Sequence, residues 1–522
     1  MSLAERVARA RATQGQGIEP GDGADPVRTD DALATFERAD ADLVSSIVAL
    51  VRERLSDVGD RASLSDEHFR VLVEGQVADV LADPRFASAT EEHQKLRSAV
   101  TDELLGFGPI QDLLEDRAIS EIMVNGMSGI YIESGGVLRK TNLKFEGLEQ
   151  LMRVIDRMVQ AYEREYANVH RGLHYLANAA TEGFEGAREK VRAFLNAAST
   201  DEIIFTRSAT EAINLVASSY GRMVNIGEGD EIILSIMEHH SNIVPWTFWR
   251  ERHGAVIKWA MVDETGNLDA AEVERLITPR TKMIAVTHMS NVLGTVAPVA
   301  EIIRIAHAHG IKVLVDGSQG AVHLPVDVRA LDADFYVFTG HKVYGPTGIG
   351  VLYGKRDLLA AMPPFNGGGE MISVVTEDYV TYNEPPHRFE AGTPPIVQAI
   401  GLGAAIDYMM QVGRENILAQ ENVLRDYAME RLGAMNSLRI FGHAKNKGAI
   451  VSFEMKGAHA HDVATIIDRQ GVAVRAGTHC AQPLLARYGV TSTCRASFAF
   501  YNTKAEIDVL AEALQKAETL FG

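Results

Sequence analysis

The chain has 522 residues, of which 46% are hydrophobic and 23% charged, a composition typical of a protein with several folded domains. It has 51 Lys and Arg against 70 Asp and Glu, and a net charge of −19 argues against general binding to nucleic acid or to anionic membranes. Two cysteines exclude a disulfide framework and a Cys-rich zinc site, and no apolar run or secretory signal indicates a membrane or export route. We therefore expect a cytoplasmic protein without a metal site.

The N-terminal part divides into a polar tail and a helical region. Residues 1–31 are small and polar, which predicts a disordered tail. Residues 32–57, 66–82 and parts of 90–106 carry apolar residues at helical spacing. These three stretches predict a small helical bundle.

A different sequence pattern follows the helical region. Residues 120–145 alternate apolar and polar side chains and are interrupted by Asn125-Gly126 and Gly135-Gly136. This pattern predicts a meander of strands with tight turns. A further helix is expected over about 147–165.

From about residue 190, short apolar strands alternate with helical stretches, which predicts a parallel or mostly parallel α/β sheet with its ligands at the carboxyl ends of the strands. The last 120 residues mix helices with a few strands and predict a second, α+β lobe. The expected strands of the sheet are 202–206, 231–236, 282–288, 312–316 and 335–339, with helices at 299–309 and 397–412. Those of the lobe are 449–455, 472–477 and 495–501.

Two charged residues end successive strands of the predicted sheet. Asp316 ends one strand, and Lys342 follows the next strand beside the glycine-rich segment 344–350. Either residue alone is most simply a turn or surface residue. Together they are what a pyridoxal phosphate (PLP) site requires, since the lysine can form a Schiff base and the carboxylate can keep the pyridine nitrogen protonated.

Two further segments agree with this interpretation. Residues 206–211 bring hydroxyls to the start of a helix, which suits a phosphate group. Residues 237–242 follow another strand, and an imidazole there can stack on a flat ring; a His-His pair by itself is more often a surface feature or a weak metal ligand. The four features together favour a PLP site.

The two cysteines differ in their surroundings. Cys494 precedes an apolar strand and is typical of a small buried residue. Cys480 lies in a polar, Gly-containing loop, where Arg475 and His479 would favour its thiolate. Arg495 begins an apolar strand, where a carboxylate of a substrate would satisfy its guanidinium.

These segments resemble a known family. Residues from about 157 to 522 contain NVHRGLH, FTRSATEAINLV, MEHHSNIVPW, THMSNVLGT, VLVDGSQG, FYVFTGHKVYGPTGIG, RFEAGTP, GTHCAQPL and CRASFAFYNT. In this order they resemble the SufS-type cysteine desulfurases, PLP enzymes of fold type I in the class V aminotransferase-like group. The resemblance implies a large PLP-binding domain over 158–400 with a mostly parallel sheet, and a small lobe over 401–522.

The resemblance also implies roles for individual residues. Lys342 would bind the cofactor covalently and move protons, Asp316 would pair with the pyridine nitrogen, and His239 would stack on the ring. The ring hydroxyl and the phosphate would be held by Gln319, Thr210, Thr339 and His341, with Gly367 and Thr393 reaching the phosphate from the second subunit of a homodimer. The substrate carboxylate would be held by Asn291 and Arg495, with Arg475 nearby.

The implied reaction converts L-cysteine to L-alanine and leaves a persulfide on Cys480, for iron–sulfur cluster assembly. The short Cys480 loop is similar to that of the SufS branch rather than the IscS branch, which implies a sulfur acceptor of the SufE or SufU type. A selenocysteine lyase remains an alternative within the same enzyme class.

The sequence departs from this family before residue 158. The family's early strand and small-residue loop, of the YLDNAAT type, are not found there. Instead, residues 32–157, and 104–138 above all, resemble the N-terminal region of CpaF-type secretion ATPases, although the chain has no GxxxxGK[ST] phosphate loop. The sequence thus predicts a fusion within the helix around 151–170. The alternative to a working desulfurase is an impaired one that serves only as a CpaF-like oligomerisation or partner-binding module.

Overall fold

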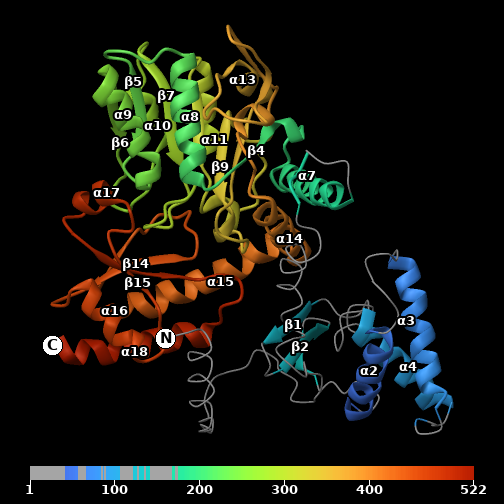
Figure 1. The fold of residues 1–522 in the computed structure, drawn as a ribbon. Helices are drawn as coiled ribbons and strands as arrows, with labels where there is room; N and C mark the ends of the chain where they lie inside the picture. Colours follow the sequence, from blue (N-terminus) through green and yellow to red (C-terminus); the bar gives the residue numbers. More distant parts are fainter. Residues whose placement is uncertain are drawn as a thin grey trace. The chain divides into compact units, whose positions relative to one another are not determined.

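The computed structural model describes residues 41–56, 66–83, 86, 90–105, 121–125, 129–134, 137–141, 167–170 and 175–521. The chain divides into two compact units, Met1–Arg157 and Met158–Gly522 (Figure 1). The tail predicted over 1–31 and the helix predicted over about 147–165 lie outside the described residues.

Three helices of the first unit match the stretches with helical spacing. They are α2 (Ala41–Ser56), α3 (Asp66–Leu81) and α4 (Thr90–Leu105). Each packs against the other two, because their apolar residues face a shared core. Members of this core from the three helices include Ile47, Val51, Val77, Leu96 and Val100.

The strand meander of the first unit is also present. Strands β1 (Glu121–Asn125), β2 (Gly129–Ser134) and β3 (Val137–Lys140) form an antiparallel sheet in the order β1-β2-β3. Ser134 lies opposite Val137, as in a tight hairpin. The alternation of apolar and polar residues therefore predicted these strands correctly.

The second unit contains a seven-stranded sheet in the order β4-β10-β9-β8-β7-β5-β6. The five strands from β9 to β6 are parallel, and β10 is antiparallel to both of its neighbours. This confirms the predicted α/β fold with a mostly parallel sheet. The strands are β4 (Ile203–Thr206), β5 (Glu231–Ser235), β6 (Val256–Ala260), β7 (Thr281–Thr287), β8 (Lys312–Asp316), β9 (Phe335–Thr339) and β10 (Gly350–Gly354).

The sequence analysis did not predict β6 and β10. Strand β6 is a partly exposed edge strand, and β10 is bounded by glycines that indicate a loop. A Cβ atom on Gly350 would lie 2.3 Å from the carbonyl carbon of Ser208, so glycine is required where β10 passes the start of the next helix.

Both faces of the large sheet are covered, which explains why its strands are almost continuously apolar. Alternate residues of β9 enter two different cores: Phe335 and Val337 face one, Tyr336 and Phe338 the other. Helices α8 (Ala209–Met223), α9 (Val244–His253) and α13 (Arg356–Ala361) cover the first face (Figure 1). Helices α7 (Tyr175–Leu195), α10 (Ala270–Leu276), α11 (Val299–Ala308) and α14 (Ile396–Val412) cover the second.

A smaller antiparallel sheet in the order β13-β14-β16-β15 forms the C-terminal lobe. Its strands are β13 (Leu438–Phe441), β14 (Ile450–Met455), β15 (Arg475–Gly477) and β16 (Thr493–Ser497), and its helices are α15 (Arg414–Gly433), α16 (Ala460–Asp468), α17 (Gln482–Arg487) and α18 (Lys504–Phe521). The strand predicted over 495–501 is wrong at its end, because β16 stops at Ser497 and the chain then turns. In the described part of the chain, no single helix has the length and apolar character to cross a membrane, although α14 and α15, bent by 74°, meet that test as a pair.

A buried ion pair ties α7 and β4 to the segment that follows residue 386. The Arg188 side chain is fully buried and donates to both carboxylate oxygens of Glu390, at 2.7 and 2.9 Å. Glu390 also accepts the backbone N–H of Phe205, and Arg188 donates to the carbonyl of Ile203. Each buried charge is thus satisfied by the other and by the backbone of β4.

Glu390→Gln should lower the free energy of unfolding by about 3 kcal/mol, because it removes the buried one of the two carboxylates that pair with Arg188 and leaves only the more exposed Glu185, at 2.9 Å. Thermal and urea denaturation of the full chain measure the change. Glu189→Gln is the matched control: Glu189 pairs with Arg192 on the exposed side of the same helix, and its loss should change stability by less than about 0.5 kcal/mol. Equal effects of the two substitutions would contradict the role of Glu390.

Candidate active site

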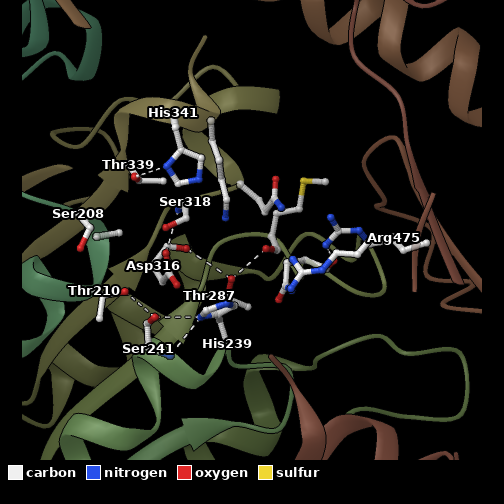
Figure 2. Close-up of a pocket in the computed structure, with 16 residues that line it drawn as sticks. Ser208, Thr210, His239, Ser241, Thr287, Asp316, Ser318, Thr339, His341 and Arg475 are labelled. Atoms are coloured by element: carbon white, nitrogen blue, oxygen red, sulfur yellow. Dashed lines mark hydrogen bonds between the residues drawn. The ribbon is translucent and has the colours of Figure 1, made fainter. Parts of the chain in front are cut away.

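A cavity of about 210 Å³ opens at the carboxyl edge of the large sheet (Figure 2). The parallel strands β5, β7, β8 and β9 all end at this edge, and β4 points the same way because both it and β9 run antiparallel to β10. Ten residues predicted from the sequence line the cavity together: Thr210, His239, Asn291, Asp316, Gln319, Thr339, His341, Lys342, Arg475 and Arg495.

Lys342 lies in the short turn Gly340–Lys342 that follows β9. Its side chain is half-buried, and in the described part of the chain no hydrogen bond or ion pair reaches its amine. Desolvation lowers the pKa of Lys342; Asp316 opposes this shift, whereas Arg495 and Arg475 add to it. A lysine with a lowered pKa is a better nucleophile and a better base near neutral pH.

Asp316 ends β8 and is buried at the base of the cavity. One carboxylate oxygen accepts the backbone N–H of Ser318 at 2.9 Å, and no cation among the described residues forms an ion pair with it. A buried carboxylate that faces a cavity and has no ion-pair partner is suited to a ligand with a positive, proton-bearing nitrogen.

Glu238 lies behind the cavity, next to His239, and is completely buried. It accepts hydrogen bonds from the backbone N–H of Thr287 at 2.9 Å and from the side chain of Asn242 at 2.7 Å. Burial raises the pKa of Glu238 to about 8, and the nearby Asp316 adds to this shift. Burial therefore favours the neutral form of the Glu238 carboxyl group.

His239 caps the short turn after β5. Its Nδ1 accepts the backbone N–H of Ser241 at 3.1 Å, which fixes the orientation of the ring. Burial lowers the pKa of His239 to about 4, so the imidazole is neutral at working pH. A neutral, fixed imidazole that lines the cavity presents a flat face to a ligand ring.

Hydroxyl groups gather on one side of the cavity. Ser208 caps the N-terminus of α8 by accepting the N–H of Glu211 at 3.2 Å. Thr210 and Ser241 share a hydrogen bond of 2.7 Å, and Thr339 bonds Nδ1 of His341 at 3.0 Å (Figure 2). Hydroxyls at the start of a helix make this side a seat for a phosphate group.

Two arginines from neighbouring strands of the small lobe also line the cavity, and Figure 2 shows Arg475 on the side opposite the hydroxyls. Arg475 and Arg495 face each other in register, and burial together with Arg475 lowers the pKa of Arg495 to about 10. Arg495 donates to the carbonyl of Asn291 at 2.8 Å, while its buried Nε has no partner among the described residues. Two cations and an unpaired donor make this side a site for a carboxylate.

Cys480 is half-buried in the turn after β15 and does not itself line the cavity. Its Sγ lies 3.8 Å from Nη2 of Arg475, as the sequence predicted for a cation beside the thiol. The prediction that His479 favours the thiolate of Cys480 is wrong, because the buried His479 ring forms a hydrogen bond of 2.9 Å with Thr493 instead. Burial and the two arginines lower the pKa of His479 to about 4, so the ring supplies no positive charge.

The remaining predicted residues have different surroundings. Gly367 and Thr393 are exposed and do not line this cavity; their contribution to the site of a second subunit stays a prediction. Cys494 is buried, as expected of a small apolar residue, and burial raises its pKa to about 12. The described part of the chain holds no group of three or more potential metal ligands.

Several lining residues were not singled out from the sequence. Most of them have a small polar side chain at a strand end or in the turn that follows it, a signal too common to select them alone. They include Ser208, Ser241, Thr287 and Ser318, together with Met289.

The comparisons with known proteins agree with this geometry. The family model for class-V aminotransferases matches residues 149–510. This chain belongs to the class-V aminotransferase family. A probable cysteine desulfurase of Halalkalibacterium halodurans is 49% identical over 399 residues, which cover 76% of this chain and 95% of that protein. A cysteine desulfurase of Pectobacterium atrosepticum is 48% identical over 415 residues, 79% of this chain and 99% of that protein.

Solved structures of the family have the same fold. The cysteine desulfurase CsdA from Escherichia coli, determined in its S-sulfonic acid form, matches with a TM-score of 0.66 and 42% identity over 71% of this chain and 92% of that one. The cysteine desulfurase of Thermococcus onnurineus NA1, in its apo form, matches with a TM-score of 0.67 and 38% identity over 70% of this chain and 91% of that one. The predicted PLP fold type I is thereby confirmed.

The family resemblance begins earlier in the chain than predicted. Residues 158–522 make up nearly 70% of the chain, whereas the matches to curated relatives cover up to 80% of it and the family model begins at residue 149. A start near residue 157 is therefore too late. The resemblance of 32–157 to CpaF-type ATPases stays a prediction.

The cofactor of this family, PLP, fits the residues that line the cavity. Asp316 lacks a cation, the amine of Lys342 lacks a partner among the described residues, and the hydroxyls at the start of α8 suit a phosphate. A ring with a basic nitrogen, an aldehyde and a phosphate would meet all three needs.

Stability should fall as the pH drops from about 6.5 toward 4, and His288 should account for part of this. His288 is buried against Tyr336, and burial lowers its pKa to about 4, so the unfolded chain binds the proton more tightly. The loss of stability caused by His288 is small above pH 6.5 and reaches about 2 kcal/mol at pH 5. His288→Asn should remove that much of the stability difference between pH 5 and 7, measured by urea denaturation, while the exposed His309→Asn should leave it unchanged. An unaltered difference in His288→Asn would show that the buried ring does not titrate as described.

Proposed function

We propose that this chain is a PLP-dependent cysteine desulfurase that converts L-cysteine to L-alanine and retains the sulfur as a persulfide on Cys480. The observation that supports this most directly is the position of Cys480, whose Sγ lies 3.8 Å from a guanidinium that lines the cavity. Close relatives named cysteine desulfurases point to the same substrate.

The proposed cofactor site uses the residues at the strand ends. Lys342 would bind the aldehyde carbon, Asp316 the ring nitrogen, Gln319 the ring hydroxyl and His239 the ring face. The phosphate would be held by Thr210, Thr339 and His341. When bound, PLP supplies an electron sink for charge that develops on the substrate.

The protein's own groups orient the substrate and move its protons. Arg495 would bind the substrate carboxylate, with Asn291 and Arg475 beside it. Because desolvation lowers the pKa of Lys342, its amine can remove the proton from the substrate's α-carbon and return a proton later. Burial lowers the pKa of His239 to about 4, so its imidazole is a weak base and a poor acceptor for that proton.

Sulfur transfer follows from the place of Cys480. The Cys480 thiol, which lies beside Arg475, gives up its proton, attacks the sulfur of the substrate cysteine and forms an S–S bond. The substrate's carbon–sulfur bond breaks, and its electron pair stays with the carbon. Protonation of that carbon, with Lys342 as the donor, yields alanine and leaves the persulfide on Cys480.

A homodimer is proposed for the working enzyme. The hairpin of β11 (Ile372–Val375) and β12 (Val380–Tyr382) lies between Gly367 and Thr393 in the chain. It exposes a run of large apolar side chains, as does a surface that a second subunit covers. These are Val374, Val375, Tyr379, Val380 and Tyr382.

We further propose that the enzyme acts in the cytoplasm, where its two free cysteines remain reduced. There it would pass sulfur to an acceptor of the SufE or SufU type for iron–sulfur cluster assembly. The unit before residue 158 would serve as a CpaF-like module for oligomerisation or partner binding.

One observation favours the impaired fusion as a second candidate. The solved structures match 70–71% of this chain, which is about the share that residues 158–522 occupy. The match leaves 8–9% of the length of those structures without a counterpart in this chain. Sequence coverage of 95–99% of the relatives' length favours the active enzyme.

An absorption spectrum separates the two candidates. We expect the purified chain to be yellow and its visible band to shift when L-cysteine is added, because Lys342, Asp316 and the phosphate seat are assembled. A chain that stays colourless after PLP is added would support the impaired fusion. Comparison of the turnover of cysteine and selenocysteine tests the lyase alternative, which requires selenocysteine to be greatly preferred.

Cys480→Ala should abolish sulfur release, with at least a thousandfold loss, because the sulfur then has no acceptor thiol. Cofactor binding should persist, since Cys480 does not line the cavity. Sulfide and alanine assays with a reductant measure the loss, and Cys494→Ala is the control. Wild-type turnover in Cys480→Ala would exclude the assigned nucleophile.

A further inference from the structure

The turn that carries Cys480 belongs to the small lobe but is held by the large domain. The backbone N–H of His240, in the turn after β5, donates to the carbonyl of Cys480 at 2.7 Å. The His240 ring nitrogen Nε2 accepts the backbone N–H of Gln482 at 3.3 Å. From the turn after β7, the side chain of Asn291 donates to the carbonyl of His479 at 2.8 Å.

The held conformation is strained. His479 and Cys480 have φ angles of 52° and 57°, so two consecutive residues with side chains adopt the left-handed region. Each such residue costs about 1–2 kcal/mol relative to ordinary backbone. Strain of this kind persists only where surrounding contacts impose it, and the three hydrogen bonds across the lobes are contacts of that kind.

The imidazole of His240 has a defined chemical state in this contact. A backbone N–H can only donate, so Nε2 must carry a lone pair and the ring proton must lie on Nδ1. Burial lowers the pKa of His240, which favours the neutral ring that the contact requires. The side chain therefore acts as a hydrogen-bond acceptor just beyond the nucleophile.

We propose that His240 is a positioning residue that clamps the Cys480 turn in its strained conformation and so places the thiol for attack on the substrate sulfur. This inference rests on the proposed role of Cys480 as the nucleophile. The clamp is distinct from the cofactor site, because His240 does not line the cavity that His239 lines.

The test compares His240→Leu with His240→Gln in the full-length enzyme loaded with PLP. Leucine removes the acceptor, whereas the glutamine oxygen reaches about the position of Nε2 and restores it. We measure persulfide formation in a single turnover, the cysteine concentration that half-saturates the spectral shift, and hydrogen–deuterium exchange of peptides covering 478–484. Exposed His309→Leu, at the end of α11, is the control.

We expect His240→Leu to slow persulfide formation five- to tenfold, as the loss of one hydrogen bond allows. The half-saturating cysteine concentration should stay within about twofold, and exchange in 478–484 should become faster. His240→Gln should restore both the rate and the slow exchange, and His309→Leu should match the wild type.

Two results would overturn the clamp: a wild-type rate of persulfide formation in His240→Leu, or equal slowing in both variants with unchanged exchange. The exchange measurement requires no turnover. It therefore reports on the clamp even if Cys480→Ala retains activity and the proposed nucleophile is wrong.

Discussion

The desolvation of an amine next to a buried carboxylate is the constraint on which the site depends. Lys342 and Asp316 end adjacent parallel strands, so sheet geometry brings them to one cavity without an ion pair between them. Burial lowers the pKa of Lys342, and Asp316 limits the shift. The result is an amine that is reactive near neutral pH and a carboxylate that is ready for a protonated ring nitrogen.

The residues next to this pair add little further charge. Neutral His239 covers the pair without adding charge, and buried Glu238, with a pKa of about 8, avoids a second negative charge near Asp316. The two arginines, Arg475 and Arg495, lie on the small-lobe side of the cavity. The guanidinium groups are thus separated from the side that carries the hydroxyls of Thr210 and Thr339.

The sequence predicted most of this cavity because buried parallel strands are visible as apolar runs, and the residues that follow them converge at one edge. The predictions from the sequence failed where the local sequence pattern and the tertiary contacts disagree. Strand β10 has the glycines of a loop because it must pass the start of α8, and the His479 ring turns to Thr493 rather than to the thiol. No pattern along the chain indicates either contact. The first joins segments that are far apart in the sequence, and the second depends on the unusual φ angle of His479.

Two hydrogen bonds through Asn291 link Arg495 to the turn that carries Cys480. Arg495 donates to the carbonyl of Asn291, whose side chain donates to the carbonyl of His479, next to Cys480. The Nε of Arg495 has no partner among the described residues, so a carboxylate can bind there while the contact with Asn291 remains. Since that turn is strained, a modest change in its supporting hydrogen bonds is enough to alter where the thiol lies. These two hydrogen bonds connect the arginine side of the cavity with the turn that carries the thiol.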